Sequence, residues 1–202
     1  MRFKRRSLYF FAAILSILFV LLTYLIATRN GNNTQDLEEI PEHLKVPLPD
    51  YPRQDFINYD KVGKLGSVHE HADIIIYVNE QKLDLSQLKY QLRDKFVHLE
   101  ERRGDVIHKH ATGITIGYFL STLGFKFEDK GSCLVLDDEQ KLCETNTKKL
   151  KVYVNNKLID NYKDYEFFDI DKILVSYGSE NEQQIQQILG NITDNAKIFS
   201  KK

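Results

Sequence analysis

The pattern of hydrophobic and polar positions divides the chain into a long apolar run, a polar spacer and a region of short strands and helices. Residues 7–28 carry no charged side chain and consist mainly of Leu, Ile, Phe, Ala and Val. At ~1.5 Å per residue, a helix of this length would be about 30 Å long, which is enough to cross a bilayer. The run is long for a cleaved signal peptide, and a cut after Ala27 would place Leu25 at position −3. The pattern therefore favours an uncleaved transmembrane anchor over a removed signal.

The residues on either side of the apolar run predict its orientation. Residues 1–6 contain four basic side chains and no acidic one, so we expect a cytoplasmic tail and a C-terminal part outside the membrane. Residues 29–66 hold all four prolines and are predicted to form an extended extracytoplasmic spacer. Asn32 begins a possible N-glycosylation sequon in this spacer. The predicted partner of residues 7–28 is therefore the lipid bilayer, and the predicted location is a cell membrane crossed once.

The region 67–178 has the patterning of a globular domain with short strands. Apolar runs predict strands at 72–79, 95–100 and 105–110, with a tight turn at Glu80-Gln81 after the first. Apolar residues at helical spacing predict a helix over 114–123, which Gly124 would end.

An internal similarity supports an α+β fold. Residues 75–83 resemble residues 150–158, and a further strand is expected at 171–178. Two similar β-units would then flank one central helix, which predicts a β-grasp-like mixed sheet. The second unit contains no histidine, so the strand pattern itself does not require the histidines of the first.

The last segment, 179–202, is predicted to form an amphipathic helix capped by Ser179. Its expected apolar side consists of Ile185, Ile188, Leu189, Ile192 and Phe199. This side would pack on the domain's own sheet, and docking into a partner's groove is the alternative. A second possible glycosylation sequon begins at Asn191, inside this predicted helix.

Composition narrows the classes of partner and scaffold. The net charge of −1 gives no global bias toward nucleic acid or anionic surfaces, so no nucleic-acid partner is expected. The two cysteines, Cys133 and Cys143, flank what looks like two short strands around an acidic turn. Outside the membrane they would form a disulfide. A thioredoxin-type redox pair would need Cys-x-x-Cys spacing, which is missing.

The histidines carry the clearest chemical signal in the sequence. Five of six lie between residues 69 and 110, and two His-x-His pairs, His69/His71 and His108/His110, bracket one predicted β-unit. Side chains two apart on a strand share a face, so each pair can direct two imidazoles at one point. All four would meet if the first strand begins beside the end of the fourth. Such a set suits Zn²⁺ or Cu²⁺, could hold Ni²⁺ or Fe²⁺, and is unsuited to Mg²⁺ or Ca²⁺.

Two further residues are candidates for the same site. His98 could be a further ligand or could contact the ligands from outside the metal's coordination shell. Asp73 is expected on the same strand face as His69 and His71, so its carboxylate could orient an imidazole. The alternative is a structural or pH-responsive histidine cluster with no metal. We find no nucleophile elbow, phosphate-binding glycine loop or His-Glu-x-x-His motif, and no catalytic residue is assigned.

The combination of a single N-terminal span, a His-x-His-Ala-Asp stretch and a later His-x-His-Ala-Thr-Gly stretch resembles a known group of sequences. These are uncharacterised, membrane-anchored extracytoplasmic proteins of ammonia-oxidising archaea. The resemblance covers roughly residues 66–178. It implies an archaeal membrane setting in which copper enzymes are prominent, and so favours copper over zinc, but it implies no activity.

The sequence therefore predicts a membrane-tethered, extracytoplasmic module that binds copper or zinc. It would serve in metal capture, in delivery or in support of a membrane complex. A non-metal interaction or accessory subunit of a membrane assembly is the first alternative, and a metal-dependent oxidoreductase is the second. We favour a protein without enzymatic activity, because the sequence shows no substrate pocket beside the histidines and Glu100 is only a candidate base.

Overall fold

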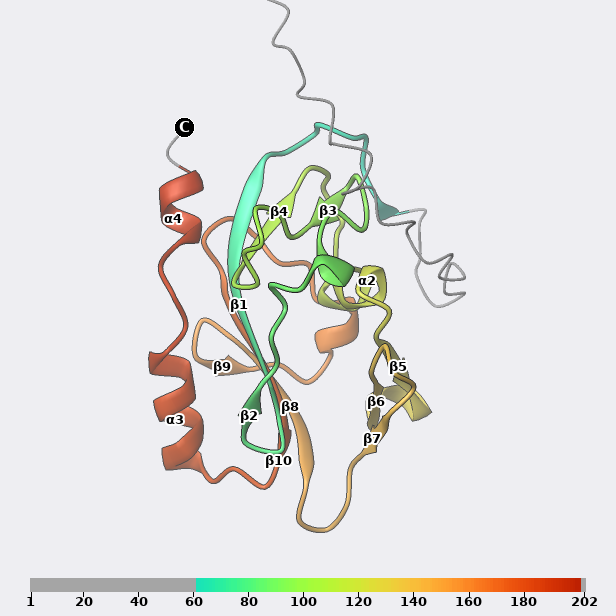
Figure 1. Cartoon of the computed structure of the whole chain (residues 1–202), viewed down its shortest axis with the longest axis vertical. Helices are drawn as coiled ribbons and strands as arrows, with labels where there is room; N and C mark the ends of the chain where they lie inside the picture. Colours follow the sequence, from blue (N-terminus) through green and yellow to red (C-terminus); the bar gives the residue numbers. More distant parts are fainter. Residues whose placement is uncertain (1–60, 201–202) are drawn as a thin grey trace, which may run out of the picture. The chain divides into compact units, whose positions relative to one another are not determined.

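The computed structural model describes residues 61–200 (Figure 1). The predicted tail at 1–6, the anchor at 7–28, most of the spacer at 29–66 and the sequon at Asn32 lie outside these residues. Within the described range, no helix is both long enough and apolar enough to cross a membrane.

A mixed sheet of seven strands forms the centre of the domain. Its strand order is β3-β4-β1-β10-β8-β9, and β2 also pairs with β1. β1 and β10 run parallel, and the other pairs are antiparallel. The prediction of an α+β fold with a mixed sheet is confirmed. The strands are β1 (Glu70–Val78), β2 (Gln81–Lys82), β3 (Val97–His98), β4 (Val106–Lys109), β8 (Lys149–Val154), β9 (Lys157–Leu158) and β10 (Lys172–Gly178).

The two similar segments form matching hairpins on either side of β10. In the β1–β2 turn, Asn79 and Glu80 have φ of 49° and 68°, and in the β8–β9 turn, Asn155 and Asn156 have φ of 50° and 65°. Positive φ at both central residues is the two-residue hairpin geometry that asparagine tolerates well. The first turn therefore lies one residue earlier than the predicted Glu80-Gln81.

Helix α2 (Ile116–Thr122) lies against one face of the sheet. The Thr115 side chain caps its first turn by accepting a hydrogen bond from the Tyr118 N–H at 3.1 Å. Gly124 follows the helix with φ of 87°, a conformation that glycine adopts without strain. The predicted central helix is confirmed in a shorter form. Its buried residues join the main core between α2 and the sheet.

A separate three-stranded sheet lies beside α2. It consists of β5 (Lys126–Glu128), β6 (Cys133–Val135) and β7 (Lys141–Cys143). Cys133 and Cys143 are directly opposite in the β6–β7 pair and form the predicted disulfide. Three short 3-10 helices complete the connections: η3 (Leu88–Tyr90), η4 (Asp129–Gly131) and η5 (Tyr162–Asp164).

The C-terminal segment differs from its prediction. It contains two helices, α3 (Glu182–Gly190) and α4 (Ala196–Phe199), in place of one continuous helix over 179–202. Asn181, and not Ser179, caps α3 through a reciprocal capping box with Gln184. Asn191 is the exposed C-cap of α3, so its sequon lies at the end of a helix instead of inside one.

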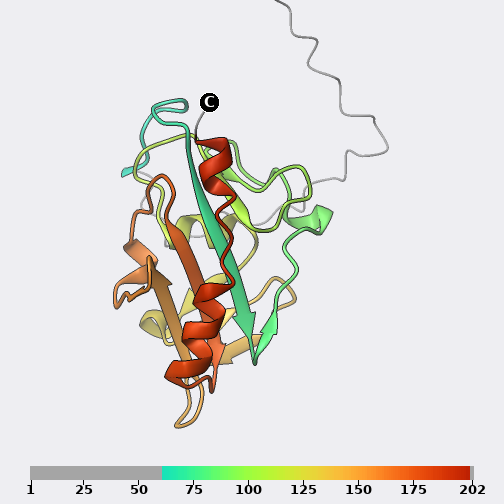
Figure 2. The same ribbon diagram turned by 90° about the vertical axis from the view of Figure 1, so that its left-hand side faces the viewer.

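Both C-terminal helices lie along the face of the sheet opposite α2 (Figure 2). A second, smaller core forms there between α3 and the strands β1 and β10. The expectation that the apolar side of this segment packs on its own sheet is met by Ile75, Leu174, Ile185, Ile188, Leu189 and Ile192.

Candidate metal centre

Three neighbouring strands bring the histidines together. β1 pairs antiparallel with β4, which places His71 opposite His108, and β3 pairs antiparallel with β4, which places His98 opposite His108. His98, His108 and His71 therefore form a row across the sheet. His69 and His110 lie at the ends of their strands, next to this row. The neighbourhood that the four-histidine prediction required is present.

The five imidazoles form a closed circle in which each ring contacts two others. Around the circle, ring centroids are separated by 4.8 Å (His69–His71), 4.7 Å (His71–His108), 5.9 Å (His108–His98), 5.0 Å (His98–His110) and 5.0 Å (His110–His69). Both His-x-His pairs and His98 thus belong to one cluster.

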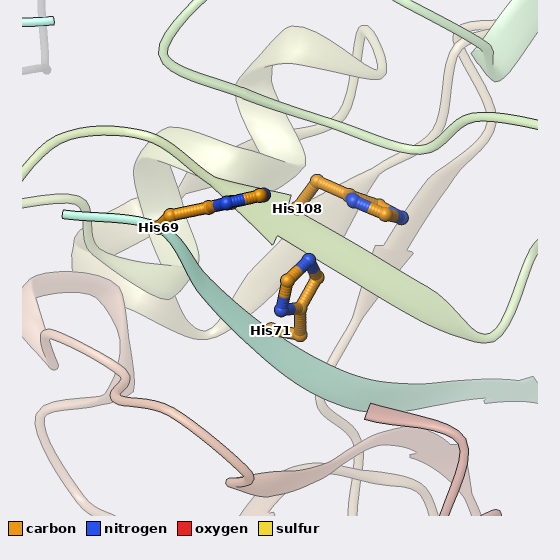
Figure 3. Close-up of side chains that lie close together, drawn as sticks. All are labelled: His69, His71 and His108. Carbon is orange, nitrogen blue, oxygen red and sulfur yellow. The ribbon is translucent and has the colours of Figure 1, made fainter. Parts of the chain in front are cut away.

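His69, His71 and His108 form the tightest group (Figure 3). One ring nitrogen from each lies within 4.8 Å of the other two. Tetrahedral coordination at about 2.0–2.1 Å would require nitrogens about 3.4 Å apart. A separation at the 4.8 Å limit would have to shorten by about 1.4 Å to coordinate zinc in this way. His69 is exposed, so its side chain can rotate to make this adjustment. His110 contacts this group through His69.

His108 is buried and is held in its neutral form. Burial lowers its pKa to about 4, against the opposing effect of the nearby Glu100 carboxylate. Its Nδ1 lies 3.4 Å from Glu100 Oε1. Its Nε2 has no hydrogen-bond partner among residues 61–200. A buried imidazole nitrogen without a partner is costly unless something binds it, and a neutral imidazole supplies the lone pair that a metal needs.

Two other histidines of the cluster are also biased toward the neutral form. Burial and the neighbouring His69 lower the pKa of His71. Burial, with His98 and His69 nearby, lowers the pKa of His110. Neutral imidazoles are the form that binds copper and zinc, so the electrostatics of these two residues fit a ligand role.

His98 is held differently from the others. Its Nδ1 lies 2.8 Å from the Asp94 carbonyl oxygen, and its Nε2 lies 3.4 Å from Glu100 Oε2. Burial lowers the pKa of His98, but the hydrogen bonds to Glu100 and Asp94 outweigh it and the net shift is upward. The same contact with His98 lowers the pKa of Glu100. Glu100 stands two residues after His98, just beyond the end of β3, and the sequence offered it only as a candidate base.

The C-terminal helix α4 forms one wall of the cluster. The Phe199 ring lies 5.5 Å from the His71 ring and 5.3 Å from the His108 ring. Ser200 Oγ lies 3.4 Å from His71 Nδ1 and donates to Asp169 Oδ1 at 2.6 Å. Neither Asp169 nor Ser200 could be assigned from the sequence, because each is far from residues 69–110 along the chain.

Asp73 has a different role from the predicted one. It is buried on the expected face, but its carboxylate accepts bonds from Thr193 Oγ1 and from the backbone N–H groups of Asn195 and Ala196. Burial raises the pKa of Asp73 despite these bonds. Asp73 therefore holds α4 in place and orients no imidazole directly.

On the opposite face of the same strands, a buried lysine fixes the β1–β4 register. Lys109 Nζ is 2.8 Å from Glu70 Oε2, 3.2 Å from Glu166 Oε1 and 2.7 Å from the Phe167 carbonyl oxygen. Lys109 is opposite Glu70 in the strand pair. Since Glu70 and Lys109 lie between the two histidines of each pair, this contact helps to position both His-x-His motifs.

A second group of metal-capable residues, Asp129, Cys133 and Cys143, does not form a comparable site. The two sulfur atoms are bonded to each other, so neither is available as a thiolate ligand.

Comparison with known proteins identifies no relative. No protein-family model matches the chain, and neither the curated proteins nor the solved structures contain a match.

Proposed function

We propose that the domain binds one copper or zinc ion through His69, His71 and His108, as an extracytoplasmic module tethered to the membrane. His110 contacts this group and is the fourth candidate ligand. Two facts about His108 carry the proposal: its buried Nε2 has no hydrogen-bond partner among residues 61–200, and it is one of three imidazoles that each offer a ring nitrogen within 4.8 Å of the others.

The ligand set supports the choice of ion. Neutral imidazoles suit copper and zinc, whereas calcium and magnesium require oxygen ligands. Glu100 beside His108 Nδ1 resembles the carboxylate–histidine–metal arrangement, in which the carboxylate fixes the tautomer and strengthens the ligand. The resemblance to archaeal membrane-anchored sequences favours copper over zinc as the bound ion.

The finer features of the architecture are part of the same proposal. We infer a β-grasp-like arrangement from the β1–β2 and β8–β9 hairpins flanking β10, with α2 packed on one face. We also infer that residues 7–28 anchor the chain in the membrane and that residues 29–66 are the spacer. The disulfide supports an oxidising, extracytoplasmic location, since such bonds are rare in the cytosol.

Metal capture or delivery fits the surroundings better than catalysis. Phe199 covers the His71 and His108 rings, and no described residue beside them is assigned as a catalytic base. The metal-dependent oxidoreductase therefore ranks below a binding module.

A second candidate function, an accessory or docking module, is favoured by apolar side chains at the same end of the domain. Leu65, Phe168 and Ile170 are 53, 52 and 48% exposed. The Gly66 N–H donates to the His110 carbonyl oxygen and the Ile170 N–H to the His71 carbonyl oxygen, so these apolar residues lie close to the cluster. A partner that receives or supplies the ion could contact them.

Metal analysis of the purified chain tests the proposal. The full chain, prepared in detergent without a polyhistidine tag, is offered Cu²⁺ or Zn²⁺, desalted and measured by mass spectrometry. We expect tight binding that His108→Ala greatly weakens. The matched control is His43→Ala, which removes the one histidine outside residues 69–110. If the wild-type chain binds neither ion, the proposal fails and the docking module becomes the leading function.

A further inference from the structure

The circle of imidazoles is too wide for one ion to bind all five rings. When five ring centroids lie about 5 Å apart around a flat circle, each centroid is roughly 4.3 Å from the centre. The centroid of a metal-bound imidazole is closer to its ion than that, because its nitrogen lies at about 2.0–2.1 Å and the centroid only about 1 Å farther out. An ion held by His69, His71 and His108 therefore leaves His98 and His110 on the other side of the circle.

His98 Nε2 and the Glu100 carboxylate face each other, and each can donate an electron pair. Because a carbonyl oxygen can only accept, the 2.8 Å contact with Asp94 requires a hydrogen on His98 Nδ1. The lone pair of a neutral His98 is then on Nε2, which lies 3.4 Å from the Glu100 carboxylate. Two acceptors at this separation repel each other unless a cation lies between them, either a proton or a metal ion.

The separation suits a metal ion. With bonds of about 2.0–2.1 Å and a tetrahedral angle, a nitrogen and an oxygen bound to one zinc ion are about 3.4 Å apart. The His110 ring lies 5.0 Å from the His98 ring. Its nitrogens do not lie within 4.8 Å of ligand atoms of both His98 and Glu100, so the partly exposed His110 side chain must rotate to supply a further nitrogen on the same side. Glu100 uses Oε2 toward His98 and Oε1 toward His108, so one carboxylate faces both halves of the circle.

We propose that the cluster holds a second metal ion, bound by His98 Nε2, the Glu100 carboxylate and His110, beside the ion of the first site. This inference rests on the proposed function, because it assigns a second position to the same cluster. Glu100 then links the two positions, as a ligand of one ion and as the orienting partner of His108 at the other. The ions are of the same class, zinc or copper.

The test counts ions per chain in matched variants. The full chain in detergent is loaded with excess Zn²⁺, desalted and analysed for zinc and protein. We expect about two ions per wild-type chain, and about one in Glu100→Gln, which keeps the side-chain size but removes the charge. His98→Gln is an independent second variant, and His69→Ala should remove the other ion and leave about one. Thermal unfolding shows whether each variant remains folded.

The outcomes separate this inference from the proposed function. Two ions in the wild type and one in folded Glu100→Gln or His98→Gln support the second position. One ion in the wild type, or two ions in the wild type and in both variants, overturns the second position while the proposed function stands. No bound zinc or copper overturns both. In the Cu²⁺-loaded wild type, two neighbouring ions should also show magnetic coupling by paramagnetic resonance, and Glu100→Gln should abolish it.

Discussion

The β1–β2 and β8–β9 hairpins have the same construction but different surroundings. Both turns use an asparagine with positive φ, and both long strands pair with β10. When Asn79 is matched to Asn155, His69 and His71 correspond to Thr145 and Thr147. The first hairpin carries half of the histidine cluster, whereas the second carries exposed threonines at the matching positions.

The difference lies in what each strand contacts beyond β10. β1 begins at Glu70 and its first residues pair with β4, which supplies His108, while α4 covers the rings with Phe199. β8 begins at Lys149, and Thr145 and Thr147 precede it in a turn that pairs with no strand within residues 61–200. A His-x-His pair on a hairpin therefore becomes a candidate metal site only when a second strand brings further imidazoles.

The largest expected effect comes from making the first hairpin like the second. His69→Thr/His71→Thr removes two of three ligands, and we expect the affinity for Zn²⁺ or Cu²⁺ at the first site to fall by at least about 10³-fold, or ~4 kcal/mol. Competition titration with a metal chelator measures it. When Thr145→His/Thr147→His is added to that variant, no tight site should appear. Equally tight binding to the transferred pair would show that β4 and α4 are not needed.

Loss of the Lys109 charge should have the largest effect on stability. Lys109→Met leaves Glu70, Glu166 and the Phe167 carbonyl oxygen without their buried partner. We expect the free energy of unfolding to fall by about 3–5 kcal/mol. The comparison is Lys151→Met on β8, where Nζ donates to the Glu180 carbonyl oxygen, and the expected loss is about 1 kcal/mol. Denaturant unfolding measures both. Equal losses of stability in the two variants would contradict a greater contribution of the Lys109 contacts between β1 and β4.

The metal-free domain should lose stability as the pH falls from 6.5 toward 4. The folded-state pKa of His108 is about 4, below its ordinary value of 6.5, so its stabilising contribution is present above pH 6.5 and lost on acidification. The lowered pKa values of His71 and His110 act in the same direction, and the raised pKa of His98 opposes them.

Urea unfolding with a chelator at pH 7.5 and pH 5 measures this dependence. For His108 alone we expect a loss of about 2 kcal/mol between the two values. His108→Leu should flatten the dependence, since the substituted side chain does not titrate. Stability that is unchanged or higher at pH 5 in the wild type would show that the cluster is not held in its neutral form.

The smallest expected effects test whether the hairpins are equivalent. Asn79→Ala and Asn155→Ala place a less tolerant residue at positive φ, which should cost each about 1 kcal/mol. Asn155→Ala should cost about 1 kcal/mol more, because the Asn155 amide also donates to Asp171 Oδ1 and accepts from the Lys172 N–H. Thermal unfolding measures the cost. Metal content should stay unchanged in both variants, because the turns lie at the other end of their strands from the cluster. A loss of metal in Asn79→Ala alone would link the turn to the site.

Local features of this comparison could be predicted from the sequence. Apolar runs predicted the strands, the similarity of residues 75–83 to residues 150–158 indicated both hairpins, and Gly124 marked the end of α2. The two His-x-His spacings placed each pair on one strand face. The disulfide was also predictable, since an acidic turn between two short apolar runs brings its ends together.

Long-range contacts could not be predicted in this way. Asp73 lies on the same strand face as His71, yet its carboxylate accepts hydrogen bonds from the segment Thr193–Ala196. Strand periodicity carries no information about a partner so far along the chain. The break between α3 and α4 follows from the same contact, because Thr193 and Asn195 bind Asp73 outside a helix. Phe199 has the spacing of the apolar side of α3, but after the break it contacts imidazoles instead.

X-ray absorption at the zinc or copper edge of the loaded full chain tests most directly whether the imidazoles of His69, His71 and His108 bind the metal. We expect a shell of at least three nitrogen scatterers at about 2.0–2.1 Å, with the outer-shell pattern of imidazole rings. His69→Thr/His71→Thr should lose part of this pattern. A first shell of sulfur, or of oxygen alone without imidazole outer shells, would contradict it.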